Sequence, residues 1–167
     1  MDVDDAGFTD SLPVRAENPT GSARRAVARS RITMLETTAT SVADNTMKKG
    51  DVLGTARYAG VQAAKNAASL LPLCNPVLVR TTTVEFSLSD EAIEVEVVVE
   101  SFDSVGVEMQ ALSAATAAAL TIYDMCKSAD RTMTIGRVAL IERSGDPSTD
   151  WRHHARNDGR TGPDLDN

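Results

Sequence analysis

Two short segments of this 167-residue chain combine charged residues in a way that suits phosphate binding or proton transfer. Lys49 precedes Gly50 and Asp51, where a helix is expected to begin, and a helix N-terminus beside a Lys favours a bound phosphate. Asp124 and Lys127 lie three residues apart on a predicted helix, so their side chains share one face. An Asp can keep a neighbouring Lys charged, whereas a partly buried Lys with a lowered pKa can act as an acid or base. On spacing alone, a solvated turn and an ion pair at a helix end explain the same residues.

Histidine and metal-site patterns are missing from the part of the sequence that is expected to be ordered. His153 and His154 follow Trp151 in a polar C-terminal segment, so imidazole acid–base catalysis is not expected in the core. Cys74 and Cys126 are far apart and form no CxxC pair, which argues against a zinc site and against a disulfide framework. The sequence also lacks a glycine-rich phosphate loop and a serine nucleophile elbow.

The periodicity of apolar residues predicts one α+β domain at residues 22–145, between a disordered N-terminal arm at 1–21 and a flexible tail at 146–167. Asp51 is expected to cap a helix that Pro72 ends. The predicted elements are a possible edge strand over 26–34, a helix over 36–45, the helix from 51 to the proline at 72, a hairpin with strands over 84–88 and 93–99, a helix over 107–127 and a strand over 134–141. This order favours an antiparallel sheet with helices on one face.

The predicted helix over 107–127 is rich in alanine and apolar over much of its circumference. A helix that is apolar all round is buried on more than one side. In a domain of this size, we expect the second buried side to face another subunit.

Acidic residues outnumber basic residues by 24 to 17. A general nucleic-acid-binding protein would normally carry a basic surface, so DNA and RNA are not expected as partners. No signal peptide is recognisable, and no apolar run reaches the roughly 18 residues that a membrane span needs. We therefore expect a soluble cytoplasmic protein without a membrane partner.

Several motifs in the ordered middle of the chain carry a resemblance to a known family. They are Lys49-Gly50-Asp51-Val52, Gly60-Val61-Gln62-Ala63-Ala64-Lys65, Pro72-Leu73-Cys74, Gly106-Val107-Glu108-Met109 and Leu120-Thr121-Ile122-Tyr123-Asp124-Met125-Cys126-Lys127. With these motifs, residues 22–145 resemble cyclic pyranopterin monophosphate synthase, the molybdenum cofactor biosynthesis protein C family.

The resemblance implies a ferredoxin-like α+β fold and a homo-hexamer built as a trimer of dimers, with active sites at the dimer interface. It also implies a small-molecule reaction that needs no cofactor. In that reaction (8S)-3′,8-cyclo-7,8-dihydroguanosine 5′-triphosphate is converted to cyclic pyranopterin monophosphate and diphosphate. Such chemistry needs cations that bind phosphate and one or two groups that transfer protons.

Carried over residue by residue, the resemblance makes Lys49, Asp124 and Lys127 the expected catalytic residues. The expected substrate-binding residues are Arg24, Asn75, Glu108, Met109, Gln110 and Arg143. Several positions depart from the family pattern. Among them, Asn75 replaces a His, Gln110 replaces a Glu, Val105 replaces a Thr, and Pro147 stands in place of a Lys. A neutral amide can orient a substrate by hydrogen bonds but does not transfer protons near pH 7.

Three functions are therefore compatible with the sequence. The first is the synthase reaction, in which Lys49 and Lys127 transfer protons. The second is that of a repurposed paralogue, which acts on a related nucleotide and uses Asn75 and Gln110 for specificity. The third is that of a non-catalytic homologue that binds a nucleotide or supports an assembly.

Overall fold

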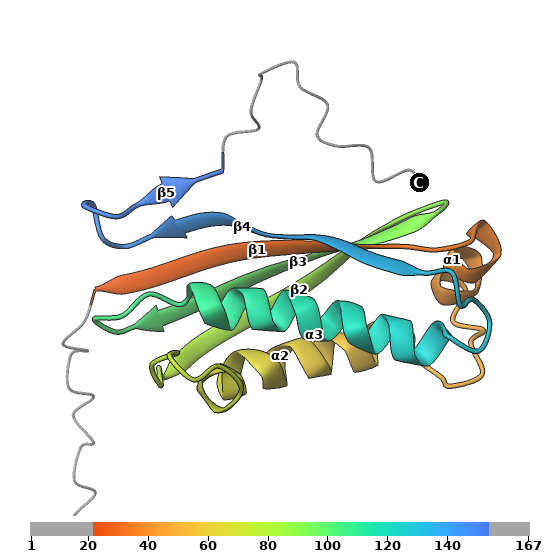
Figure 1. Cartoon of the computed structure of the whole chain (residues 1–167), viewed down its shortest axis with the longest axis horizontal. Helices are drawn as coiled ribbons and strands as arrows, with labels where there is room; N and C mark the ends of the chain where they lie inside the picture. Colours follow the sequence, from red (N-terminus) through yellow and green to blue (C-terminus); the bar gives the residue numbers. More distant parts are fainter. Residues whose placement is uncertain (1–21, 154–167) are drawn as a thin grey trace, which may run out of the picture.

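The computed structural model describes residues 22–153, which form one antiparallel sheet with helices. In chain order the elements are β1 (Ala23–Thr33), α1 (Glu36–Ala43), α2 (Val52–Leu70), β2 (Val79–Ser89), β3 (Ala92–Phe102), α3 (Glu108–Cys126), β4 (Thr134–Ser144) and β5 (Trp151–Arg152). The strand order is β2-β3-β1-β4-β5, and the two long helices α2 and α3 lie side by side on one face of the sheet (Figure 1). The predicted α+β fold, with an antiparallel sheet and helices on one face, is confirmed.

The sheet face under the helices is built by alternation of buried and less buried residues along the strands. In β3 the buried residues are Ile93, Val95, Val97 and Val99. Their β-branched side chains suit a strand and form the centre of the hydrophobic core. A buried polar contact joins this face to α3, because the Ser30 hydroxyl of β1 donates a 2.9 Å hydrogen bond to the Ala115 carbonyl. The core therefore fixes α3 directly over the middle of the sheet.

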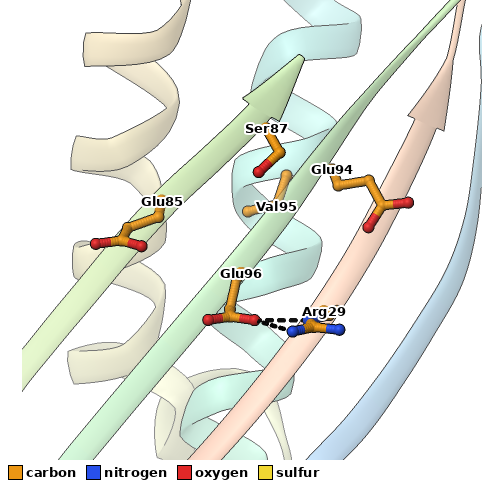
Figure 2. Close-up of a pocket in the computed structure, with 6 residues that line it drawn as sticks. All are labelled: Arg29, Glu85, Ser87, Glu94, Val95 and Glu96. Atoms are coloured by element: carbon orange, nitrogen blue, oxygen red, sulfur yellow. Dashed lines mark hydrogen bonds and ion pairs between the residues drawn. The ribbon is translucent and has the colours of Figure 1, made fainter. Parts of the chain in front are cut away.

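The opposite sheet face carries charged side chains that pair across strands. Arg29 lies opposite Glu96, and Arg31 lies opposite Glu94 in the β1–β3 register. The guanidinium-to-carboxylate distances are 2.6 Å and 2.7 Å, and such cross-strand pairs contribute roughly 0.2–1 kcal/mol each. The Arg29–Glu96 pair lies beside a hollow of about 240 Å³ that Glu85 also lines. Figure 2 shows the side chains around it. Arg29, the arginine that lines this hollow, is already paired with Glu96 of the neighbouring strand. None of the predicted site residues lines the hollow.

β1 is the central strand of the sheet, so the prediction that it is an edge strand is wrong. It pairs with β3 over its whole length and with β4 on its other side. The outward-facing arginines Arg25, Arg29 and Arg31 give β1 the polar alternation of an exposed strand. That polarity reflects the open face of the sheet and not a free edge.

The second buried side of α3 faces α2 of the same chain, so the prediction that another subunit covers it is also wrong. Within one chain the alanines of α3 at 111, 114, 115, 118 and 119 are fully buried. α2 approaches closely because Gly60 has no side chain, and a Cβ there would lie 3.3 Å from the Ala114 carbonyl oxygen and 3.1 Å from a Val84 methyl carbon. Small residues on both helices therefore complete the core without a partner.

Predicted boundaries agree with the structure for α2 and differ at the C-terminus. Asp51 caps α2 as expected, because its carboxylate accepts a 2.8 Å hydrogen bond from the Gly54 backbone N–H. β4 continues to Ser144, and residues 151–152, predicted as tail, form β5 against the end of β4. The predicted arm at 1–21 and the tail beyond 153 lie outside the described residues. None of the helices in the described part combines the length and the apolar character that a membrane crossing needs.

Candidate active site

The three predicted catalytic residues meet at the C-terminal end of α3. Lys127 Nζ lies 2.7 Å from Asp124 Oδ1, and Lys49 Nζ lies 3.4 Å from Asp124 Oδ2. Lys49 also donates a 2.6 Å hydrogen bond to the Asp124 backbone carbonyl. It reaches α3 from the loop before α2, where Gly50 adopts a φ of 92° that residues with side chains rarely take. The structure thus joins the two segments whose residue types indicated chemistry.

Asp124 is held as a carboxylate between two ammonium groups. The hydrogen bonds from Lys127 and then from Lys49 lower the pKa of Asp124 below its ordinary value. All three side chains are exposed, so a ligand can approach the cluster from solvent. Two ammonium donors fixed by one carboxylate can bind phosphate oxygens or deliver a proton to a reacting atom.

The N-terminus of α2 is less suited to phosphate than its sequence indicates. The Asp51 carboxylate already accepts the Gly54 backbone N–H, and it places a negative charge at this helix end. Lys49 points its ammonium group at Asp124 on α3 instead. The cation of this segment therefore belongs to the cluster at the end of α3.

Five of the six predicted substrate-binding residues gather at the N-terminal end of α3. They line a cavity of about 470 Å³, formed by Leu73, Cys74, Asn75, Val105, Gly106, Glu108, Met109, Gln110, Leu140 and Arg143. That volume is typical of small-molecule sites. Glu108 Oε1 lies 2.7 Å from Arg143 Nη1, and both side chains are partly buried. The cavity therefore combines an ion pair, two amide side chains and a largely apolar wall.

The two groups of residues lie at opposite ends of α3 (Figure 1). Glu108 is the first residue of the helix and Asp124 belongs to its last turn. At a rise of 1.5 Å per residue, the backbone positions of these two residues are about 24 Å apart. One chain therefore does not bring the predicted catalytic residues and the predicted substrate-binding residues into one site.

Comparison with known proteins shows the family to which the chain belongs. The model of the MoaC family matches residues 14–146. The chain belongs to the MoaC family. A Roseiflexus sp. (strain RS-1) protein named cyclic pyranopterin monophosphate synthase is 43% identical over 151 residues, which are 89% of this chain and 94% of the relative. A protein of the same name from Chloroflexus aurantiacus (strain ATCC 29366 / DSM 635 / J-10-fl) is 45% identical over 133 residues, which are 78% of this chain and 82% of the relative.

Arg24, the sixth predicted substrate-binding residue of this MoaC-family chain, does not line the large cavity. Its guanidinium donates hydrogen bonds to the carbonyl oxygens of Asp103 and Ser104, at 3.2 Å and 3.1 Å. It also lies 3.5 Å from the Asp146 carboxylate, and its side chain is 14% exposed. Hydrogen bonds from Ser148 and the nearby charge of Arg24 lower the pKa of Asp146. In this chain Arg24 fixes the loop before α3 and the turn after β4.

Three residues around the cavity were not expected from the sequence. Cys74 faces Gln110, with 3.6 Å between the thiol sulfur and the amide nitrogen. Thr149 accepts a 2.9 Å hydrogen bond from Arg143, and Asp146 pairs with Arg24. The sequence does indicate an ordered turn at Asp146 and Thr149, because an Asp followed by Pro and Ser is typical of such a turn.

A metal ion has no evident set of protein ligands here. Among residues 22–153, no group of three or more His, Cys, Asp and Glu side chains is arranged to hold one.

Proposed function

We propose that this protein is a cyclic pyranopterin monophosphate synthase of molybdenum cofactor biosynthesis, a lyase-type enzyme. It converts (8S)-3′,8-cyclo-7,8-dihydroguanosine 5′-triphosphate to cyclic pyranopterin monophosphate and diphosphate. The observation that carries the proposal is the Lys49–Asp124–Lys127 cluster. This cluster occurs in a MoaC-family chain whose relatives with that name are 43% and 45% identical to it.

The proposed roles follow from the charges of the two clusters. Lys127 and Lys49 transfer protons and attract the triphosphate, while Asp124 keeps their ammonium groups in place. The cavity at the other end of α3 takes the ring system against Met109, and Arg143 offers its guanidinium to a phosphate oxygen. Asn75 and Gln110 offer neutral side-chain amides, which can form hydrogen bonds with a ligand or a neighbouring loop but do not transfer protons near pH 7.

The proposed site is shared by two chains, which form the dimers of a homo-hexamer. The support is the separation of about 24 Å between the two ends of α3, since the cyclised nucleotide must meet both groups of residues. In a dimer with twofold symmetry, the same two surfaces meet twice, so each chain supplies one end of each site. Two such composite sites then form at each dimer interface.

The function is tested by a timed assay with purified protein and freshly prepared cyclised dihydroguanosine triphosphate. The full-length protein is expected to release diphosphate and cyclic pyranopterin monophosphate. Lys127→Ala should lower the rate by roughly 10²–10⁴-fold, the usual contribution of one proton-transfer group, without changing the assembly mass measured by light scattering.

Lys48→Ala is the matched control for this assay. Lys48 is an exposed neighbour of Lys49 that lies outside the cluster, so its removal should leave the rate nearly unchanged. A rate for the unmodified protein no higher than that of Lys127→Ala would contradict the proposal. Binding of the substrate without release of diphosphate would identify a non-catalytic homologue instead.

A further inference from the structure

The corner of the cavity beside Gln110 is held together by one buried amide. Gln110 is 3% exposed. Its Nε2 lies 3.4 Å from the Asn75 backbone carbonyl oxygen and 3.6 Å from Cys74 Sγ. Buried side-chain amides are normally hydrogen-bonded, and both of these contacts go to the same loop. The first turn of α3 is thereby tied to the segment 73–76.

The 73–76 loop is also restricted by its own sequence and by a turn hydrogen bond. Pro72 and Pro76 flank it and restrict the backbone at both ends. A turn hydrogen bond of 3.0 Å from the Cys74 N–H to the Leu71 carbonyl closes its first half. Leu73 is 97% exposed and so does not anchor it. Between the prolines, Gln110 is the side chain from another element that holds the loop by a hydrogen bond.

The contact requires a neutral donor at position 110. The Asn75 carbonyl oxygen can only accept a hydrogen bond, so an ionised carboxylate at 110 would repel it. Glu108 and Gln110 are two positions apart on α3 and point to different sides of the helix. The ionic part of the cavity, Glu108 with Arg143, is therefore separate from its amide part.

We propose that Gln110 is a positioning residue which sets the 73–76 loop so that Asn75 presents a neutral hydrogen-bonding group to the ligand. Asn75 is exposed and lines the cavity. The ligand group that it recognises is an uncharged polar edge of a planar ring, of the carbonyl, amide or ring-nitrogen kind. Only the identity of that ligand rests on the proposed function. The positioning of the loop by Gln110 does not depend on it.

A double-mutant cycle on kcat/KM tests whether Gln110 acts through Asn75. Asn75→Ala and Gln110→Met should each lower kcat/KM about tenfold, mainly by raising KM, as expected for one lost hydrogen bond. The double variant should also lose about tenfold, because Gln110 has nothing left to position once the Asn75 amide is gone. An additive loss of about a hundredfold would overturn the proposal, since it would mean that Gln110 contributes independently.

A second measurement uses no substrate, so it separates this proposal from the proposed function. Cys74 is half-buried against Gln110, whereas Cys126 is fully buried. In Gln110→Met the freed loop should expose Cys74, and its reaction with a thiol reagent, located by peptide mass mapping, should become about tenfold faster. Cys126 should stay slow, because burial raises its pKa to about 11.

Gln62→Met is the matched control, since it makes the same chemical change on the surface of α2, where Gln62 contacts Tyr58. It should leave the Cys74 rate unchanged. An unchanged Cys74 rate in Gln110→Met would overturn the positioning role even if the synthase assay succeeds. A faster Cys74 rate in a protein that makes no product would support the positioning role and refute only the proposed reaction.

Discussion

Among the single residues, Asp130 is a buried carboxylate that supports the end of α3 where the Lys49–Asp124–Lys127 cluster lies. It is 2% exposed and accepts hydrogen bonds from the backbone N–H groups of Leu35 and Thr132, both at 2.8 Å, and from the Thr132 hydroxyl at 2.7 Å. Burial raises the pKa of Asp130, but these hydrogen bonds outweigh burial and the pKa lies below its ordinary value. Asp130 thereby ties the segment after Lys127 to the start of α1.

Asp130→Asn should lower the free energy of unfolding at pH 7 by about 1–3 kcal/mol, the usual cost of losing hydrogen bonds to a buried charged group. A carboxyl whose pKa is depressed by folding stabilises the protein above the ordinary pKa of 3.8. This stabilisation is lost as the pH falls through the folded-state pKa. Urea denaturation at pH 7 and pH 3 should therefore show a smaller difference from the unmodified protein at pH 3.

Asp44→Asn is the control for this comparison, because Asp44 is exposed at the end of α1. It should change stability little at either pH. An equal loss for Asp130→Asn at both pH values would show that the charge of Asp130 does not contribute to stability.

At the scale of the elements, local patterns in the sequence predicted the types of helices and strands but not their neighbours. The alternation in β3 and the Asp51 cap of α2 are local features, and both agree with the structure. The place of β1 in the sheet depends on pairing with β3 and β4, which are far away in the sequence. The partner of the alanine face of α3 depends in the same way on the close approach at Gly60. Neither contact leaves a signal in the local periodicity.

A polar side chain in β2 offers a test of how the core is packed. The Thr82 hydroxyl is buried and has no hydrogen-bond partner among the described residues. Thr82→Val keeps the shape and removes the unsatisfied group, so we expect a gain of about 1 kcal/mol in the free energy of unfolding. Thr83→Val is the control, because Thr83 is exposed and exposed substitutions usually change stability by less than about 0.5 kcal/mol. A loss of stability in Thr82→Val, measured by urea denaturation, would show that the hydroxyl has a partner.

In the molecule as a whole, the predicted helix over 107–127 already separates Glu108 from Asp124, whereas the meeting of Lys49 with Asp124 depends on tertiary contacts. The Asp124–Lys127 pair could be anticipated, because these residues are three apart at the end of one helix. The distance between this pair and Glu108 follows from the length of α3, and the predicted helix over 107–127 has nearly the same bounds. The role of Arg24 in holding a loop is also a tertiary feature, since its partners lie in two distant turns.

Mixing two inactive variants shows whether two chains complete each proposed catalytic site. Lys127→Ala damages the Lys49–Asp124–Lys127 cluster, and Arg143→Ala damages the cavity at the other end of α3. Dissociated together and reassembled in equal amounts, they should recover about a quarter of the unmodified activity. Half of the dimers then contain both variants, and each of those dimers has one undamaged site.

Lys127→Ala mixed with Asp124→Ala is the control, because both changes damage the same cluster and no undamaged site can form. Synthase activity is measured by the release of diphosphate. Recovery in the first mixture and none in the control is the predicted result. A first mixture that stays as inactive as its two components would contradict the shared site.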